Sequence, residues 1–143
     1  MFSYKTLVRD KLIADATVKG LFSAAASGSC RINMENLVLS AAYPQILIGW
    51  GGGQTTPNMD GDEGVLNITI ECRGTGSVHG HQEVGKFRSA ILNVIDDTSI
   101  SNSTAVCYHI RKISEEDGYD EEEKVYWSRM NFTTWYKQNF NVA

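Results

Sequence analysis

The sequence is poor in cysteine and proline and has no long apolar run. Its three cysteines, Cys30, Cys72 and Cys107, are widely spaced and form no CxxC pair. Neither a disulfide framework nor a zinc motif is therefore expected, and three free thiols in a reducing cytosol is the simplest interpretation. The most apolar stretch, residues 37–50, is too short and too interrupted to span a bilayer. The opening residues also lack the apolar core of a signal peptide, so no membrane partner is expected.

A basic excess is also missing. Thirteen Lys and Arg residues stand against 17 Asp and Glu, giving a formal net charge of −4 and a pI near 5.3. Because a dedicated duplex-DNA binder normally shows a basic surplus or stripe, the charge disfavours that class. With 143 residues, of which 42% are hydrophobic, the chain is long enough to bury a core. We expect one domain over residues 1–143.

Hydrophobic periodicity predicts helices from about Phe2 to Ala16 and from about Gly80 to Asp96. The clearest strand is at residues 66–72, where apolar and polar side chains alternate. Residues 30–39 fit either a strand or a turn of helix. Loops are expected at residues 51–64 and 114–123, and further strands at residues 46–50, 105–113 and 124–137.

Together these elements predict an α+β fold. We expect a mainly antiparallel sheet of about four strands, two helices packed on one face, and a long C-terminal hairpin. At ~3.3 Å per residue the last strand would reach roughly 40 Å, more than a compact core needs, so we expect it to protrude or bend. It carries Trp127 and Trp135 on one face and Tyr126 and Tyr136 on the other. We therefore expect it to be sandwiched inside the domain or to meet another subunit.

Several short patterns come close to chemical motifs. Residues 74–79 begin as GxGxxG but end in histidine, and residues 80–86 spell GxxxxGK without the following Ser or Thr, so nucleotide binding is disfavoured. His79 and His81 would need further ligands to hold zinc, and no second His or Cys cluster supplies them. Two segments are acidic and are expected to be solvated turns; their carboxylates are Asp60, Asp62, Glu63, Glu115, Glu116, Asp117, Asp120, Glu121, Glu122 and Glu123.

The order of elements resembles the tail-terminator, or tail-completion, proteins of long-tailed bacteriophages, which join head and tail. The resemblance rests on Asp15-Ala-Thr-Val18-Lys-Gly-Leu21 after the opening helix, and on the strand that follows Pro44. The alternating strand at residues 66–73, the helix at residues 83–95 and the final hairpin complete it. The pattern covers nearly the whole chain.

The resemblance implies a virion structural protein of the tail or neck, assembled in the host bacterial cytoplasm. Such proteins form a ring, commonly a hexamer, that caps the tail tube protein, stops its polymerisation and offers a surface to the head connector. Genomic DNA passes through the lumen without being read, and no catalytic residue or cofactor is implied. The acidic residues above are candidates for the lumen or rim, where they would repel DNA. The candidate interface anchors, which could equally be core residues, are Trp50, Tyr119, Trp127 and Trp135.

Two other classes stay open. A small host-protein-binding or inhibitor module would use the same hairpin to engage its partner. A small metal-dependent enzyme would need His79 and His81 to converge with the carboxylates of residues 60–63 or 115–123.

Overall fold

The computed structural model describes residues 2–24, 31–34, 43–55, 62–74, 79–102 and 105–138. Within them lie three helices, α1 (Phe2–Ala14), α2 (Ala16–Ala24) and α3 (Gly80–Ile95). The strands are β1 (Ile32–Met34), β2 (Gln45–Thr55), β3 (Asp62–Cys72), β4 (Thr98–Ser101), β5 (Ala105–Asp120) and β6 (Val125–Gln138). None of the described helices is long and apolar enough to cross a membrane.

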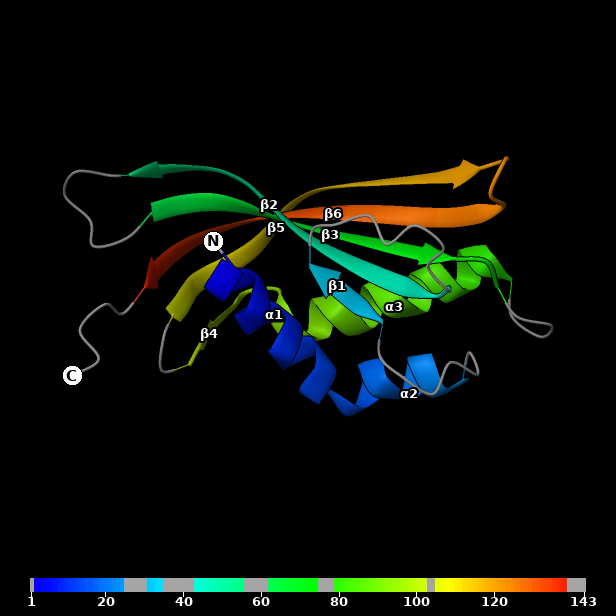
Figure 1. Cartoon of the computed structure of the whole chain (residues 1–143), viewed down its shortest axis with the longest axis horizontal. Coiled ribbons are helices and arrows are strands. Elements are labelled where there is room, and N and C mark those ends of the chain that lie inside the picture. Colours follow the sequence, from blue (N-terminus) through cyan, green and yellow to red (C-terminus); the bar gives the residue numbers. More distant parts are fainter. Residues whose placement is uncertain are drawn as a thin grey trace.

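The six strands form one curved sheet in the order β1-β2-β3-β6-β5-β4. β1 runs parallel to β2, and every other neighbouring pair is antiparallel. Figure 1 shows the three helices together on one side of the sheet. We call this side the helix face of the sheet, and the opposite side the outer face.

The expected sheet of about four antiparallel strands with two helices is wrong: the sheet is mixed, has six strands and packs against three helices. The two extra strands, β1 and β4, are edge strands of three and four residues, too short for alternation to reveal. The helix expected from Phe2 to Ala16 ends at Ala14, and a second helix, α2, begins after Asp15. The Asp15 carboxylate accepts a hydrogen bond from the Val18 backbone N–H at 3.0 Å, which caps the start of α2.

The core lies between the helix face and the helices. Alternation along β3 buries Leu66, Ile68 and Ile70 completely. The apolar stripe of α3 packs against β3 and β6, and the Phe87 ring meets Phe22 of α2 edge-on, with ring centroids 4.9 Å apart. Burial of such side chains contributes about 1.5–3 kcal/mol each, which fixes α3 against the middle of the sheet.

β6 is a central strand and does not project alone from the domain. β3 pairs with it from Asp62 opposite Tyr136 to Cys72 opposite Tyr126, and β5 pairs with its other side. Successive side chains therefore alternate between the two faces of the sheet. Phe132 is fully buried against the helices, whereas Trp127 and Trp135 lie on the outer face and are partly exposed.

Candidate functional site at the C-terminal hairpin

Most of the acidic segment expected to be a loop belongs to β5. Ladder pairing with β6 continues as far as Asp120 opposite Val125, and only residues 121–124 form the turn. Glu115 lies opposite Met130, and Asp117 lies opposite the buried Ser128. The expectation of a loop over residues 114–123 is thus wrong, because backbone pairing with β6 holds these acidic residues in a strand.

Arg88 of α3 gathers two of the carboxylates on the helix face. Its Nη1 donates to Asp117 Oδ1 at 2.8 Å and to Ser128 Oγ at 3.3 Å. Its Nε lies 3.6 Å from Glu115 Oε2, and Lys112 Nζ lies 3.5 Å from the other oxygen of the same carboxylate. The Arg88 side chain is 21% exposed, against 34% for Glu115 and 45% for Asp117, so the cation is partly desolvated while both carboxylates still meet water and are screened by it.

The cluster shifts the protonation of Asp117. Burial alone would raise the pKa of this carboxyl, but the Ser128 hydrogen bond and the Arg88 charge outweigh burial and hold the pKa below its usual value. Asp117 is therefore an ionised partner of Arg88 at neutral pH.

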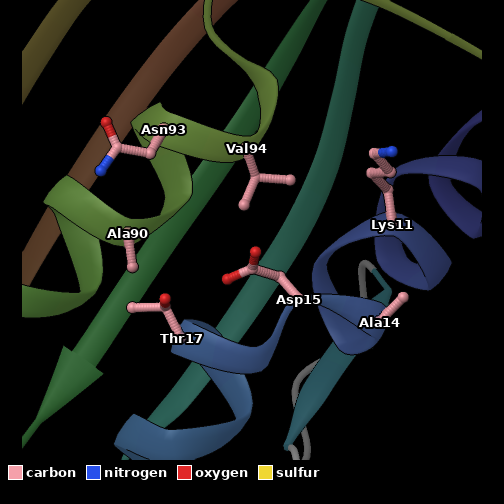
Figure 2. Close-up of a pocket in the computed structure, with 7 residues that line it drawn as sticks. All are labelled: Lys11, Ala14, Asp15, Thr17, Ala90, Asn93 and Val94. Carbon is pink, nitrogen blue, oxygen red and sulfur yellow. The ribbon is translucent and has the colours of Figure 1, made fainter.

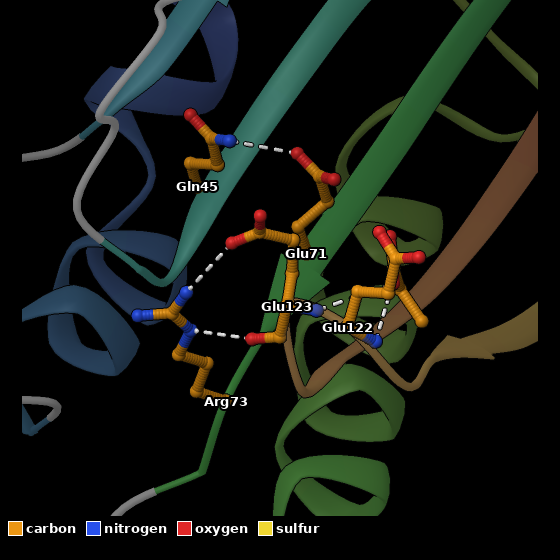
Figure 3. A network of polar contacts seen from close by, with 6 residues as sticks. Gln45, Glu71, Arg73, Glu122 and Glu123 are labelled. Carbon is orange, nitrogen blue, oxygen red and sulfur yellow. Dashed lines mark hydrogen bonds and ion pairs between the residues drawn. The ribbon is translucent and has the colours of Figure 1, made fainter.

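The turn of the hairpin is held by a second set of contacts. Asp120 Oδ1 accepts backbone hydrogen bonds from Glu122 and Glu123 at 3.0 and 3.2 Å. Arg73 Nη2 lies 3.3 Å from Glu123 Oε2, a contact drawn as a dashed line in Figure 3. The Arg73 guanidinium carbon lies 4.4 Å from the centroid of the Tyr43 ring. Because this ion pair is exposed, it contributes about 0–1 kcal/mol.

An aromatic group joins the hairpin to the start of α3. The rings of Tyr119 and Tyr126 lie 4.4 Å apart, and the Tyr126 ring meets that of His79 at 4.9 Å. The Tyr126 hydroxyl lies 3.3 Å from His79 Nε2, while His79 Nδ1 accepts the His81 backbone N–H at 3.2 Å and caps α3. Both ring nitrogens of His79 thus have partners within the chain. Among the residues the structure describes, no three His, Cys, Asp or Glu side chains are grouped to hold a metal.

The predicted anchors fall in different parts of the sheet. The Trp127 ring lies over Gly118 on the neighbouring strand, so closely that a side chain at that position would overlap it. Tyr119, the next residue along β5, is 45% exposed and lies opposite Tyr126, on the other face of the sheet from Trp127. Trp135 lies further along β6, opposite Tyr108, and Trp50 of β2 pairs with Leu66 of β3. Tyr119 and Trp127 therefore share one end of the sheet.

The second acidic segment lies far from the first. Asp60 falls outside the described residues, whereas Asp62 and Glu63 begin β3, where Asp62 pairs with Tyr136. Val125, which pairs with Asp120, lies eleven positions before Tyr136 in β6, a distance of about 35 Å at the usual rise per residue. The two acidic segments therefore lie at opposite ends of the sheet (Figure 1).

A separate cavity of about 360 Å³ lies between the α1–α2 junction and α3 (Figure 2). Asp15 lines it, but one oxygen of that carboxylate already caps α2. None of the residues predicted from the sequence to act in binding or catalysis lines it; its walls are Lys11, Ala14, Asp15, Thr17, Ala90, Asn93 and Val94.

The sequence matches no family model and no curated protein. Among solved structures, the chain is similar to a chain in the virion of a native gene transfer agent particle. The two share 12% identity over 94% of each chain, with a TM-score of 0.67. The chain also aligns with the SPP1 Dit (gp 19.1) protein, described as a hub adsorption apparatus of phages that infect Gram-positive bacteria. That alignment covers 65% of this chain and 40% of the other, at 14% identity and a TM-score of 0.32, too weak to support a conclusion. The gene transfer agent chain establishes that this chain shares its fold with a virion chain.

Proposed function

We propose that this chain is a structural component of a phage-type tail and serves there as the tail terminator. The observation that carries the proposal is the shared fold: 94% of this chain superimposes on 94% of a virion chain. The order of elements in the sequence supports the same assignment independently. No catalytic role and no cofactor are part of the proposal.

In this role six copies form a ring on the end of the tail tube. Contacts that repeat from copy to copy close a ring when the rotation between neighbours is right. One face of the ring fits the growing end of the tube, and the other presents a surface to the head connector that a further tube ring cannot use. Termination of the tube is then steric and needs no chemistry.

The outer face of the sheet supplies the proposed contacts between copies. Trp127 and Trp135 are partly exposed there, and the exposed Tyr119 lies at the same end as Trp127 but on the helix face, opposite Tyr126. Large aromatic side chains are the commonest anchors of protein interfaces because they bury much area at a low cost in entropy. At a net charge of −4 each, six copies carry about −24, which favours passage of DNA over adhesion to it.

The test is assembly and termination with purified protein. Light scattering and negative-stain imaging should show six-fold rings, free or on tube ends, and adding the protein to polymerising tube protein should stop growth. Particles assembled without the gene should have tails of uncontrolled length. Asn131→Ala, on the same outer face, is the control for Trp127→Ala and Trp135→Ala, because it shortens a side chain there without removing an aromatic ring. A monomer that leaves tube growth unchanged would contradict the proposal and favour the host-protein-binding alternative.

A further inference from the structure

The distal half of β5, residues 114–120, is an acidic strand at the edge of the sheet. Within the described residues it pairs only with β6, because β4 pairs with β5 no further along than Ile110. Four of its seven residues are Glu or Asp. Neighbouring like charges disfavour a compact strand, and edge strands already open more readily than central ones.

Strand alternation divides these carboxylates between the two faces. Glu115 and Asp117 lie on the helix face with Arg88, whereas Glu116 lies between them in sequence and therefore on the outer face, opposite Arg129. Arg88 is the α3 side chain that bridges both helix-face carboxylates, and it is largely buried in doing so.

We propose that Arg88 is a positioning residue that keeps residues 114–120 in the sheet. Its charge allows two carboxylates to lie against α3; without it Asp117 would lose its ion pair, and Glu115 would keep only that with Lys112. The distal half of β5 then separates from β6, while β3 and the core remain folded. If the proposed function holds, this separation also disturbs ring assembly, because the segment carries Tyr119 and the glycine over which the Trp127 ring lies, Gly118.

Amide hydrogen exchange on the whole chain tests this. In Arg88→Met, those amides of residues 114–120 that hydrogen-bond to β6 should exchange faster by on the order of tenfold or more, while those of residues 66–72 in β3 keep their protection. Glu116→Gln is the matched control, because it removes a charge from the same run without touching Arg88, and it should not speed exchange. Arg88→Lys keeps the charge without the guanidinium fork, so the rise should be smaller. If Arg88→Met does not fold, Arg88→Lys is measured in its place.

A charge-neutral triple variant separates electrostatics from packing. Arg88→Met combined with Glu115→Gln and Asp117→Asn removes both sides of the interaction and should restore most of the protection, since neutral groups of similar shape need no compensation. Unchanged exchange in Arg88→Met, an equal rise in β3, or no rescue by the triple variant would each overturn the proposal. If the exchange result holds and no rings form, the proposed function fails and the role of Arg88 stands.

Discussion

Replacing Gly80 with alanine should destabilise the protein, although the same change normally stabilises a helix. Gly80 is buried at the first position of α3, beneath the hairpin. A methyl carbon at this position would lie 2.5 Å from Cδ2 of Tyr126 and 3.2 Å from the backbone carbonyl carbon of Arg73. Carbon atoms in contact normally lie about 3.5–4.0 Å apart. Either the Tyr126 ring or the start of α3 must therefore move.

The expected magnitude follows from two opposing terms. Forcing an extra methyl into a packed site costs about 1–3 kcal/mol, and the gain in helix propensity from glycine to alanine is at most about 1 kcal/mol. We expect a net loss of about 1–2 kcal/mol. Gly20, within α2, is the matched control because no atom lies within 4 Å of an added methyl. Gly20→Ala should raise the free energy of unfolding by about 0.5–1 kcal/mol.

Urea denaturation of the two variants measures whether the free energy of unfolding falls in Gly80→Ala and rises in Gly20→Ala, as expected. In a Tyr126→Ala background the cost of Gly80→Ala should fall sharply, because the overlapping ring is gone and only the contact with Arg73 remains. If Gly80→Ala and Gly20→Ala shift the midpoint in the same direction, Tyr126 does not close over the start of α3 as described.

Three further outcomes follow from the same geometry. Because the folded-state pKa of Asp117 is lowered, its contribution to stability is present above the unfolded pKa near 4 and is lost as the pH falls through the folded value. The protection factors of β5 amides should accordingly fall below about pH 4, and by less in Asp117→Asn, whereas a fall already complete at pH 6 would contradict this reasoning. Burial raises the pKa of both described thiols, that of Cys107 to about 12 and that of Cys72 further. Neither thiol should therefore be alkylated by iodoacetamide at pH 8 until urea unfolds the chain, which mass spectrometry of the labelled peptides measures. Trp127→Ala and Trp135→Ala should weaken ring assembly by about 2 kcal/mol or more if these residues are anchors, measured by light scattering on subunits that keep their circular dichroism; rings unaffected by both would exclude them.

Elements with strict periodicity were predictable from the sequence. The helix expected from Gly80 to Asp96 is confirmed as α3, and the alternating strand at residues 66–72 is confirmed as the buried part of β3. In both, the apolar positions recur at the period of the element and face the same core. Local sequence was sufficient there because burial and periodicity point to the same conformation.

The glycine-rich segment was harder to predict. Residues 51–64 were expected to be a loop, but β2 continues to Thr55 and β3 begins at Asp62. The register shifts between Gly51 and Gly53, which marks a bulge or irregularity in the pairing of β2 with β3. Glycine has low strand propensity yet is well suited to bulges, so propensity alone gives the wrong conformation here. The decisive interaction is backbone pairing with β3.

The acidic segment shows why composition did not reveal the candidate site. Seven carboxylates in nine residues indicate a solvated loop only if nothing compensates them. In the fold, Arg88 pairs with Glu115 and Asp117 from a helix that lies nearly thirty residues earlier in the sequence. No local pattern identifies that partner, because it depends on how α3 crosses beneath β6 and reaches the edge strand.

The same pairing limits which acidic residues can form a lumen or rim. Glu115 and Asp117 face Arg88, Glu123 pairs with Arg73, and the Asp120 carboxylate accepts hydrogen bonds from the amides of the turn. A carboxylate beside a fixed cation contributes little to the field at a distance, because the two charges largely cancel. Repulsion of DNA by this end of the sheet would therefore come mainly from the exposed carboxylates that have no ion pair within the described part of the chain, Glu116, Asp120, Glu121 and Glu122. The segment thus has two separable parts: one that holds β5 in place and one that is available to set the charge of a lumen.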